Sequence, residues 1–237
     1  MPLAKRKAPR RKPFCRPKGA ALARMRECCE DCSKEDGALP TLALGHRLRQ
    51  QKNMTVFPDK GPANTENAVR LAIEAARQHN IGHIVVASNT GSTARLFLEE
   101  AQSRHIVCVT HACGFRAPGE MEISREERAL LQARGVDVLT TTHVLSGAER
   151  GLSRRFQGIG PVEVMAKTLY MLGQGAKVCV EIAVMALDAG LIPYGEDIVA
   201  VGGTGRGADS VLILAPSHAS SILETRIRAI VCKPWDC

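Results

Sequence analysis

The stretch His83–Arg95, HIVVASNTGSTAR, places the tightest constraint on how this chain folds. Its run Ile84–Ala87 is short, apolar and β-branched, which is typical of a strand buried on both faces of a sheet. A polar turn with four hydroxyl side chains and one glycine follows, and apolar residues then recur at helical spacing from Ala94. This order presents backbone N–H groups and a positive helix end to an anion. The stretch therefore predicts a phosphate-binding loop at residues 88–93.

The same alternation of strands and helices continues along the chain. Apolar residues at i, i+3, i+4 and i+7 predict a helix that begins at Asn64 or Thr65 and is closed by Gly82. A capping box of Ser124 and Glu127 starts another helix, which a glycine at 135 ends. Because strands and helices alternate, the sheet is expected to be largely parallel. The predicted strands are 56–57, 84–87, 105–110 and 136–140, and further helices are predicted at 95–103 and from Pro161.

The last part of the chain is less regular. Residues 177–190 fit a strand or a helix by period, and their length and their Ala and Met content favour a helix. Strands at 198–201 and 211–214 flank a glycine-rich turn, and residues 226–232 are expected to add an edge strand. Residues 141–160 show no clear period, so we expect a long loop, which inside a compact domain is usually functional or mobile.

Charge divides the chain into two parts. Residues 1–50 contain 13 Lys/Arg and five Asp/Glu, which is the whole formal excess of +8, while the remaining residues hold 19 of each. We therefore expect residues 1–53 to form a disordered basic extension and residues 54–237 to form one α/β domain. The odd count of nine cysteines and the lack of an apolar secretory segment predict a cytoplasmic protein, and no run of 18 apolar residues suggests a membrane span.

The extension also contains closely spaced cysteines whose thiolates suit zinc or an iron–sulfur cluster, although a single CxxC without a second pair is a weak signal. The alternatives are a solvated tail, an arm that touches nucleic acid or an acidic partner, and a true start at Met25 or Met54. Nucleic acid is otherwise not expected as a partner, because the rest of the chain is neutral and aromatic residues make up 3%. The candidate ligands are Cys15, Cys28, Cys29 and Cys32.

Three polar side chains stand out beyond the loop. His111 and His143 each follow a predicted strand, at the carboxyl edge where open α/β sheets bind ligands. Each is a candidate acid/base, with a structural histidine as the alternative. Glu181 lies in an apolar run and needs a partner, which is either an arginine or ligand group or a helix-to-loop hydrogen bond.

The glycine-rich turn GGTGRGADS is no dinucleotide fingerprint, because strands are expected on both of its sides. It fits a tight hairpin, or a backbone that approaches a ligand with Arg206 and Asp209 adding charge. Residues 88–93 lack the Gly-Lys-Ser/Thr ending of a P-loop, so ATP hydrolysis has no support. Inert core thiols are expected in three apolar runs, at Cys108, Cys179 and Cys232.

Several of these segments resemble a known family. Residues 63–96, ANTENAVRLAIEAARQHNIGHIVVASNTGSTARL, are similar to the opening helix, strand and loop of the carboxy-terminal domain of pyruvate kinase. In that domain a threonine/serine-glycine-serine loop holds a phosphate of the sugar bisphosphate activator. The segments HIVCVT, THACGF, HVLSGAERGLSRR, KVCVEIAVMALDAG and VAVGGTGRGAD extend the likeness, over residues 56–234, to a stand-alone pyruvate-kinase-carboxy-terminal-like family described chiefly from archaea.

The resemblance implies a three-layer αβα sandwich with a mostly parallel sheet, and FMN as the ligand. It does not imply pyruvate kinase activity, because nothing in these 237 residues resembles the barrel domain with its catalytic lysine and phosphoenolpyruvate site. Asn89 and Ser92 replace basic residues of the kinase loop, so the phosphate depends more on backbone donors. Arg150, Arg154 or Arg155 can supply the missing charge.

The expected function is the binding of a small phosphorylated ligand, FMN foremost. The alternatives are an enzyme, either a flavin oxidoreductase or one that acts on a small phospho-metabolite, and a regulatory module that contacts a partner through the basic extension. A homo-oligomer is compatible with each. The residues expected to contact the ligand are Ser88, Asn89, Thr90, Gly91, Ser92, Thr93, Thr110, His111, Gly114, Ser146, Arg150, Glu181, Gly203, Arg206 and Asp209.

Overall fold

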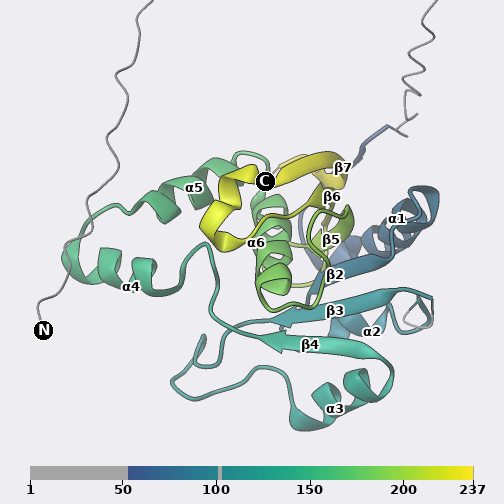
Figure 1. Ribbon diagram of the computed structural model, residues 1–237, viewed down its shortest axis with the longest axis horizontal. Helices are drawn as coiled ribbons and strands as arrows, with labels where there is room; N and C mark the ends of the chain where they lie inside the picture. Colours follow the sequence, from purple (N-terminus) through teal and green to yellow (C-terminus); the bar gives the residue numbers. More distant parts are fainter. Residues whose placement is uncertain (1–52, 101–102, 237) are drawn as a thin grey trace, which may run out of the picture. The chain divides into compact units, whose positions relative to one another are not determined.

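The computed structural model describes residues 53–100 and 103–236, and the basic extension with its four cysteines lies outside this part. The described residues form one seven-stranded sheet with helices against both faces (Figure 1). The strand order is β1-β7-β6-β5-β2-β3-β4. The strands are β1 (Thr55–Phe57), β2 (His83–Ala87), β3 (His105–Thr110), β4 (Val136–Thr140), β5 (Ile198–Gly202), β6 (Ser210–Ala215) and β7 (Arg226–Pro234).

Strand directions confirm a mostly parallel sheet. β2 pairs in parallel with β3 and β5, and β3 pairs in parallel with β4. β6 runs antiparallel to both of its neighbours, so β5 and β6 form the predicted hairpin. The prediction that 226–232 is an edge strand is wrong, because β1 adds outside β7 with Thr55 opposite Cys232. That long-range pairing leaves no local signal in the sequence.

The helices make the predicted three layers. Cores on the two faces use alternate residues of the same strands, as the two-residue period of a strand requires. Ile84 and Val86 of β2 pack with helices α1, α2 and α3, whereas Val85 packs with helix α6 on the opposite face.

Among the described residues, no helix is both long and apolar enough to cross a bilayer. The α-helices are α1 (Thr65–Gln78), α2 (Ser92–Arg95), α3 (Arg125–Ala133), α4 (Gly147–Phe156), α5 (Pro161–Tyr170) and α6 (Gln174–Asp188), and short 3-10 turns are η1 (Pro62–Asn64) and η3 (Ala219–Glu224).

The predicted loop at 141–160 contains a helix instead. α4 occupies ten of these residues and buries none of them, so its sequence carries no apolar stripe. Leu152 and Phe156 are 58% and 75% exposed. Hydrophobic periodicity detects helices that pack on a core, which is why this one was missed.

Two predicted helix boundaries also change. In place of the helix predicted at 95–103, the structure has the four-residue helix α2, which ends at Arg95, and non-helical turns begin at Leu96. Phe97 is nevertheless fully buried, as its spacing suggested. α1 ends at Gln78, and the left-handed residue after it is Asn80 rather than Gly82. The start of α3 agrees with the prediction, because Ser124 Oγ accepts a hydrogen bond from the Glu127 amide.

Candidate functional site

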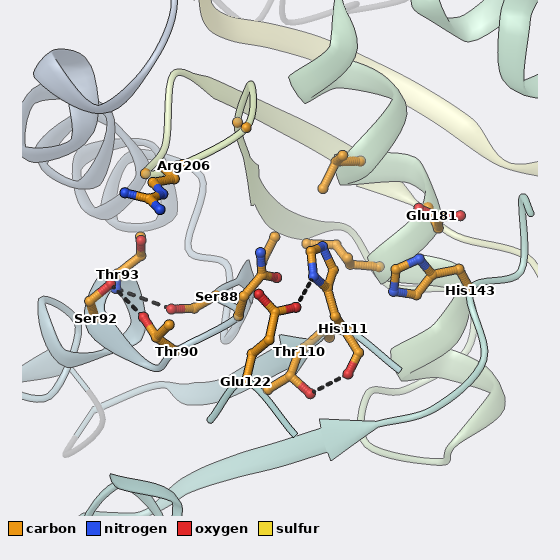
Figure 2. Close-up of a pocket in the computed structure, with 18 of the residues that line it drawn as sticks. Ser88, Thr90, Ser92, Thr93, Thr110, His111, Glu122, His143, Glu181 and Arg206 are labelled. Carbon is orange, nitrogen blue, oxygen red and sulfur yellow. Dashed lines mark hydrogen bonds and ion pairs between the residues drawn. The ribbon is translucent and has the colours of Figure 1, made fainter. Parts of the chain in front are cut away.

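A cavity of about 440 Å³ lies at the carboxyl ends of β2, β3 and β5, the edge at which open α/β sheets bind ligands (Figure 2). Its volume is within the range of small-molecule sites. His143, a predicted acid/base, lines it. So do ten of the residues expected to contact the ligand: Ser88, Asn89, Thr90, Ser92, Thr93, Thr110, His111, Glu181, Gly203 and Arg206.

Loop 88–93 combines hydroxyl groups with free backbone donors. The buried Ser88 Oγ accepts hydrogen bonds from the amides of Thr93 and Ala94, at 3.1 and 3.4 Å. The four successive amides of residues 89–92 have no acceptor among the described residues. α2 is only four residues long, so its dipole is small and an anion here depends on these N–H groups and hydroxyls.

Gly91 fixes the shape of this loop rather than lining the cavity. Its φ of 90° is left-handed, and a Cβ at this position would lie 2.6 Å from Glu127 Cγ. The Glu127 carboxylate in turn accepts a hydrogen bond from Arg95 Nε at 2.7 Å. The loop therefore rests against the first turn of α3 through a contact that permits no side chain.

Arg206 projects from the turn between β5 and β6. Figure 2 shows its guanidinium on the same side of the cavity as Ser92 and Thr93. Within the described part of the chain, no carboxylate pairs with it. The backbone of this turn approaches α1 closely, since a Cβ at Gly207 would lie 2.3 Å from Thr65 Oγ1. β5 and β6 thus form a hairpin, as the first interpretation predicted, and its turn places Arg206 at the cavity; the approach of its backbone to a ligand stays a prediction.

Asp209 holds this turn together and does not line the cavity. Its side chain is fully buried and accepts hydrogen bonds from the amides of Gly61 and Thr204 and from Ser210 Oγ, at 3.0, 3.1 and 2.8 Å. These donors satisfy a carboxylate that would otherwise be costly to bury. Asp209 was expected to add charge to a ligand site, but its carboxylate instead accepts hydrogen bonds within the protein.

The other end of the cavity carries two imidazoles. His111 Nδ1 lies 2.5 Å from Glu122 Oε2, and its ring stacks on Phe115 with centroids 3.8 Å apart. The His143 ring lies 5.3 Å from that of His111. Burial lowers the pKa of His143, and the carboxylate of Glu181 offsets part of this shift. His143 is therefore mainly neutral near pH 7, the form in which one ring nitrogen donates and the other accepts.

Glu181 anchors the loop that carries His143. Its Oε1 accepts a hydrogen bond from the Leu145 amide at 3.0 Å, and its Oε2 pairs with Lys177 Nζ at 2.6 Å. The partner is thus a lysine one turn earlier in α6 rather than an arginine, and the helix-to-loop hydrogen bond is present. Because Glu181 also lines the cavity, it combines a structural contact with a place in the site.

Several expected residues do not line the cavity. Gly114 shapes the loop after β3, where its amide donates to the Glu120 carbonyl at 2.8 Å. Ser146 precedes α4, and the arginines expected to supply charge lie on that exposed helix. The sequence placed them near the ligand because it predicted a loop there. These arginines are Arg150, Arg154 and Arg155.

Two groups of lining residues were not predicted. Four come from the loop after β3, which has no periodic signal: Arg116, Glu120, Met121 and Glu122. A second group lies on one face of α6, and its spacing of i, i+4, i+8 and i+11 was a readable signal. They are Gln174, Val178, Ile182 and Met185.

Three of the four described cysteines lie in the core. Burial raises the pKa of Cys108 and of Cys232 to about 12, and it raises the pKa of Cys179 well above its usual value. All three are buried, which confirms inert core thiols. Within 53–100 and 103–236, no group of three His, Cys, Asp or Glu residues is placed to hold a metal, and Cys15, Cys28, Cys29 and Cys32 lie outside this range.

Comparison with known proteins decides the family. Residues 66–214 match the pyruvate kinase alpha/beta domain. The chain belongs to this family. Solved structures of Cryptosporidium parvum pyruvate kinase are similar to it: one is 22% identical over 66% of this chain and 23% of the kinase, with a TM-score of 0.35. Another, in complex with ADP, is 23% identical over 65% of this chain and 24% of the kinase, with a TM-score of 0.33. The chain thus spans about a quarter of the length of these kinases.

Proposed function

We propose that this pyruvate kinase alpha/beta domain binds a small phosphorylated molecule, with the phosphate between loop 88–93 and Arg206. The observation that carries the proposal is the unpaired guanidinium on the same side of the cavity as the hydroxyl groups of Ser92 and Thr93 (Figure 2). Arginine binds phosphate through charge-assisted hydrogen bonds. The free amides of residues 89–92 supply further donors.

FMN is the specific ligand that the resemblance implies, and the residues present fit it. The phosphate end has donors, and an apolar wall of Val109, Val178, Ile182 and Met185 suits a flat ring. His143 adds a nitrogen donor and acceptor for the polar edge of such a ring. A bound flavin would supply redox chemistry, while the protein's part is to bind and orient it.

The test compares FMN with riboflavin, which is the same molecule without the phosphate. Calorimetry and thermal unfolding are measured on the full chain and on two variants. Arg206→Ala removes the proposed phosphate contact, and Arg154→Ala removes an exposed arginine that does not line the cavity. At 100 times Kd, a ligand stabilises its protein by about 2.7 kcal/mol, so specific binding gives a clear shift in Tm.

We expect FMN to bind the wild type and Arg154→Ala alike, and to bind Arg206→Ala at least about tenfold more weakly, since charge-assisted hydrogen bonds contribute about 1.5–3 kcal/mol. Riboflavin should bind weakly to all three proteins. Equal affinity for riboflavin and FMN would contradict the phosphate site. If FMN does not bind but inorganic phosphate still shifts the amide NMR signals of residues 89–92, FMN is the wrong ligand and the proposed phosphate site stands.

A specific pair of side chains favours a second candidate, an enzyme that moves a proton on a phosphorylated carbonyl compound. His111 is hydrogen-bonded to Glu122, and the mainly neutral His143 lies beside it in the same cavity. A paired imidazole and a neutral one are suitable groups for acid–base catalysis. The assay is incorporation of solvent deuterium into phosphorylated aldoses and ketoses. Exchange that persists in both His111→Asn and His143→Asn would refute these roles.

A further inference from the structure

The outer face of α5 is an apolar surface that no other described residues cover. α5 packs on the core through Ala166, which is buried, and through Leu169, which contacts the apolar cluster around α6. Its opposite face forms a groove of about 460 Å³. The large apolar side chains of this groove are strongly exposed: Ile159 is 84% exposed, Val164 is 53% exposed and Met171 is 81% exposed. Single exposed apolar residues are ordinary, but several gathered in one groove mark an interaction site.

The neighbouring helix α4 extends this apolar surface. The Glu149 carboxylate accepts hydrogen bonds from the amides of Val162 and Glu163 in the first turn of α5, at 3.3 and 3.2 Å. Glu149, Leu152 and Phe156 lie at i, i+3 and i+7, so both apolar side chains are on the face of α4 that meets α5. α4 buries none of its ten residues, and a helix of this length is marginal without tertiary packing. A partner on this surface would therefore also stabilise α4.

The charges at the groove match a second copy of the same chain. Glu163 and Lys167 both line it, and neither has an ion-pair partner among the described residues. They lie at equal distances along the chain on either side of residue 165, and so do Ile159 and Met171. If two α5 helices pack antiparallel about a two-fold axis at that residue, each glutamate meets a lysine and each isoleucine meets a methionine. The groove is therefore self-complementary, as an isologous interface requires.

Charge favours a second copy over an anionic membrane. The one acidic and one basic side chain of the groove leave it without a net charge that would attract lipid headgroups. Arg150 and Arg154 lie on the side of α4 opposite Leu152 and Phe156, so of the three arginines only Arg155 flanks the apolar face. We propose that two copies of this chain associate through the outer face of α5 and the adjoining face of α4, with the α5 helices antiparallel.

The test is the oligomeric state of the full chain, measured by sedimentation velocity between about 1 and 100 μM, since dimerisation depends on concentration. We expect a dimer that dissociates on dilution. Met171→Glu places a charge against the apolar side of the partner subunit's groove and should weaken the dimer at least about tenfold, as the loss of a central interface residue does. Arg154→Glu changes an exposed residue outside the groove and should leave the dimer unchanged.

Exchanging the charges tests the two-fold arrangement itself. Glu163→Lys and Lys167→Glu each place like charges opposite one another in a homodimer, so each variant should shift toward monomer. A mixture of the two variants restores opposite charges across the axis, and the double variant Glu163→Lys/Lys167→Glu restores them within one chain. Both should therefore dimerise again, which variants that had merely unfolded would not do.

Three outcomes would overturn the inference, and none of them depends on the phosphate site. One is a chain that stays monomeric over the whole concentration range. Another is a dimer that Met171→Glu and both charge variants leave intact, because its interface would then lie on a different face. The third is a monomer that binds vesicles of phosphatidylserine and phosphatidylcholine and loses this binding in Met171→Glu, which would make a membrane the partner of the groove.

Discussion

Replacing Lys177 by methionine should lower the free energy of unfolding more than replacing any exposed residue that lines the cavity. Lys177 and Glu181 lie one helical turn apart in α6, and each side chain is 6% exposed. Their charged atoms are 2.6 Å apart, and the second carboxylate oxygen accepts only the Leu145 amide among the described residues, at 3.0 Å. Methionine preserves most of the volume but leaves a buried carboxylate without a counter-ion.

The size of the expected loss in stability follows from the burial of the Glu181 carboxylate. Removing one member of a buried ion pair costs about 3–5 kcal/mol, because the remaining charge is desolvated and uncompensated. This is a large part of a typical stability of about 5–15 kcal/mol. The double variant Lys177→Met/Glu181→Gln removes both charges and keeps an amide oxygen for the Leu145 amide. It should therefore be more stable than Lys177→Met, by about 2 kcal/mol or more.

Urea unfolding followed by far-UV circular dichroism measures these differences, since Trp235 is 74% exposed and its fluorescence reports the core poorly. Comparing both single variants with the double variant gives the coupling energy of the pair. Arg70→Met, which breaks an exposed i,i+4 pair with Glu74 at 3.7 Å, is the matched control and should cost less than about 1 kcal/mol. A loss below about 1 kcal/mol for Lys177→Met, with no recovery in the double variant, would refute the reasoning.

Three further perturbations have defined outcomes. Because the fold lowers the pKa of His143, the contribution of this residue to stability is full above about pH 6.5 and is lost as the pH falls below that value. His143→Asn should therefore make the free energy of unfolding in urea depend less on pH in this acidic range. Gly91→Ala should cost about 1–3 kcal/mol by urea unfolding, since alanine is strained at a φ of 90° and its Cβ would meet Glu127. Cys108, with a pKa raised to about 12, should resist alkylation at pH 8 while the exposed Cys113 reacts, as peptide mass mapping would show.

Each of these has its own control. The pKa of His83 is also lowered, so His83→Asn reports the part of the pH dependence that does not come from His143. An unchanged pH profile in His143→Asn would contradict its assignment. Gly82→Ala, at a position open to solvent with no atom within 4 Å of an added Cβ, should be tolerated, and equal losses at Gly82 and Gly91 would refute the steric argument. Alkylation of Cys108 in the folded protein as fast as that of Cys113 would contradict its burial.

The sequence was most informative where a local pattern reflects burial. The β-branched runs of β2 and β3 predicted strands, and the polar residues after β2 predicted the loop at 88–93. α4 was missed because it buries nothing. The place of β7 inside the sheet rather than at its edge was missed because it depends on pairing with β1, more than 150 residues away in the chain. The loop that brings Glu122 to His111 depends on tertiary contacts, so no spacing in the sequence predicts that pair.

The way loop 88–93 is held explains how a one-turn helix can support an anion site. Ser88 Oγ ties the start of the loop to the amides of Thr93 and Ala94, and Gly91 rests against Glu127. These contacts fix the direction of the free amides before any ligand arrives, so binding requires little ordering of this side of the cavity. Arg206 lies instead on an exposed, glycine-rich turn whose anchors are Asp209 and the contact with α1. Differences in affinity among phosphorylated ligands should therefore depend more on the Arg206 turn than on the loop itself.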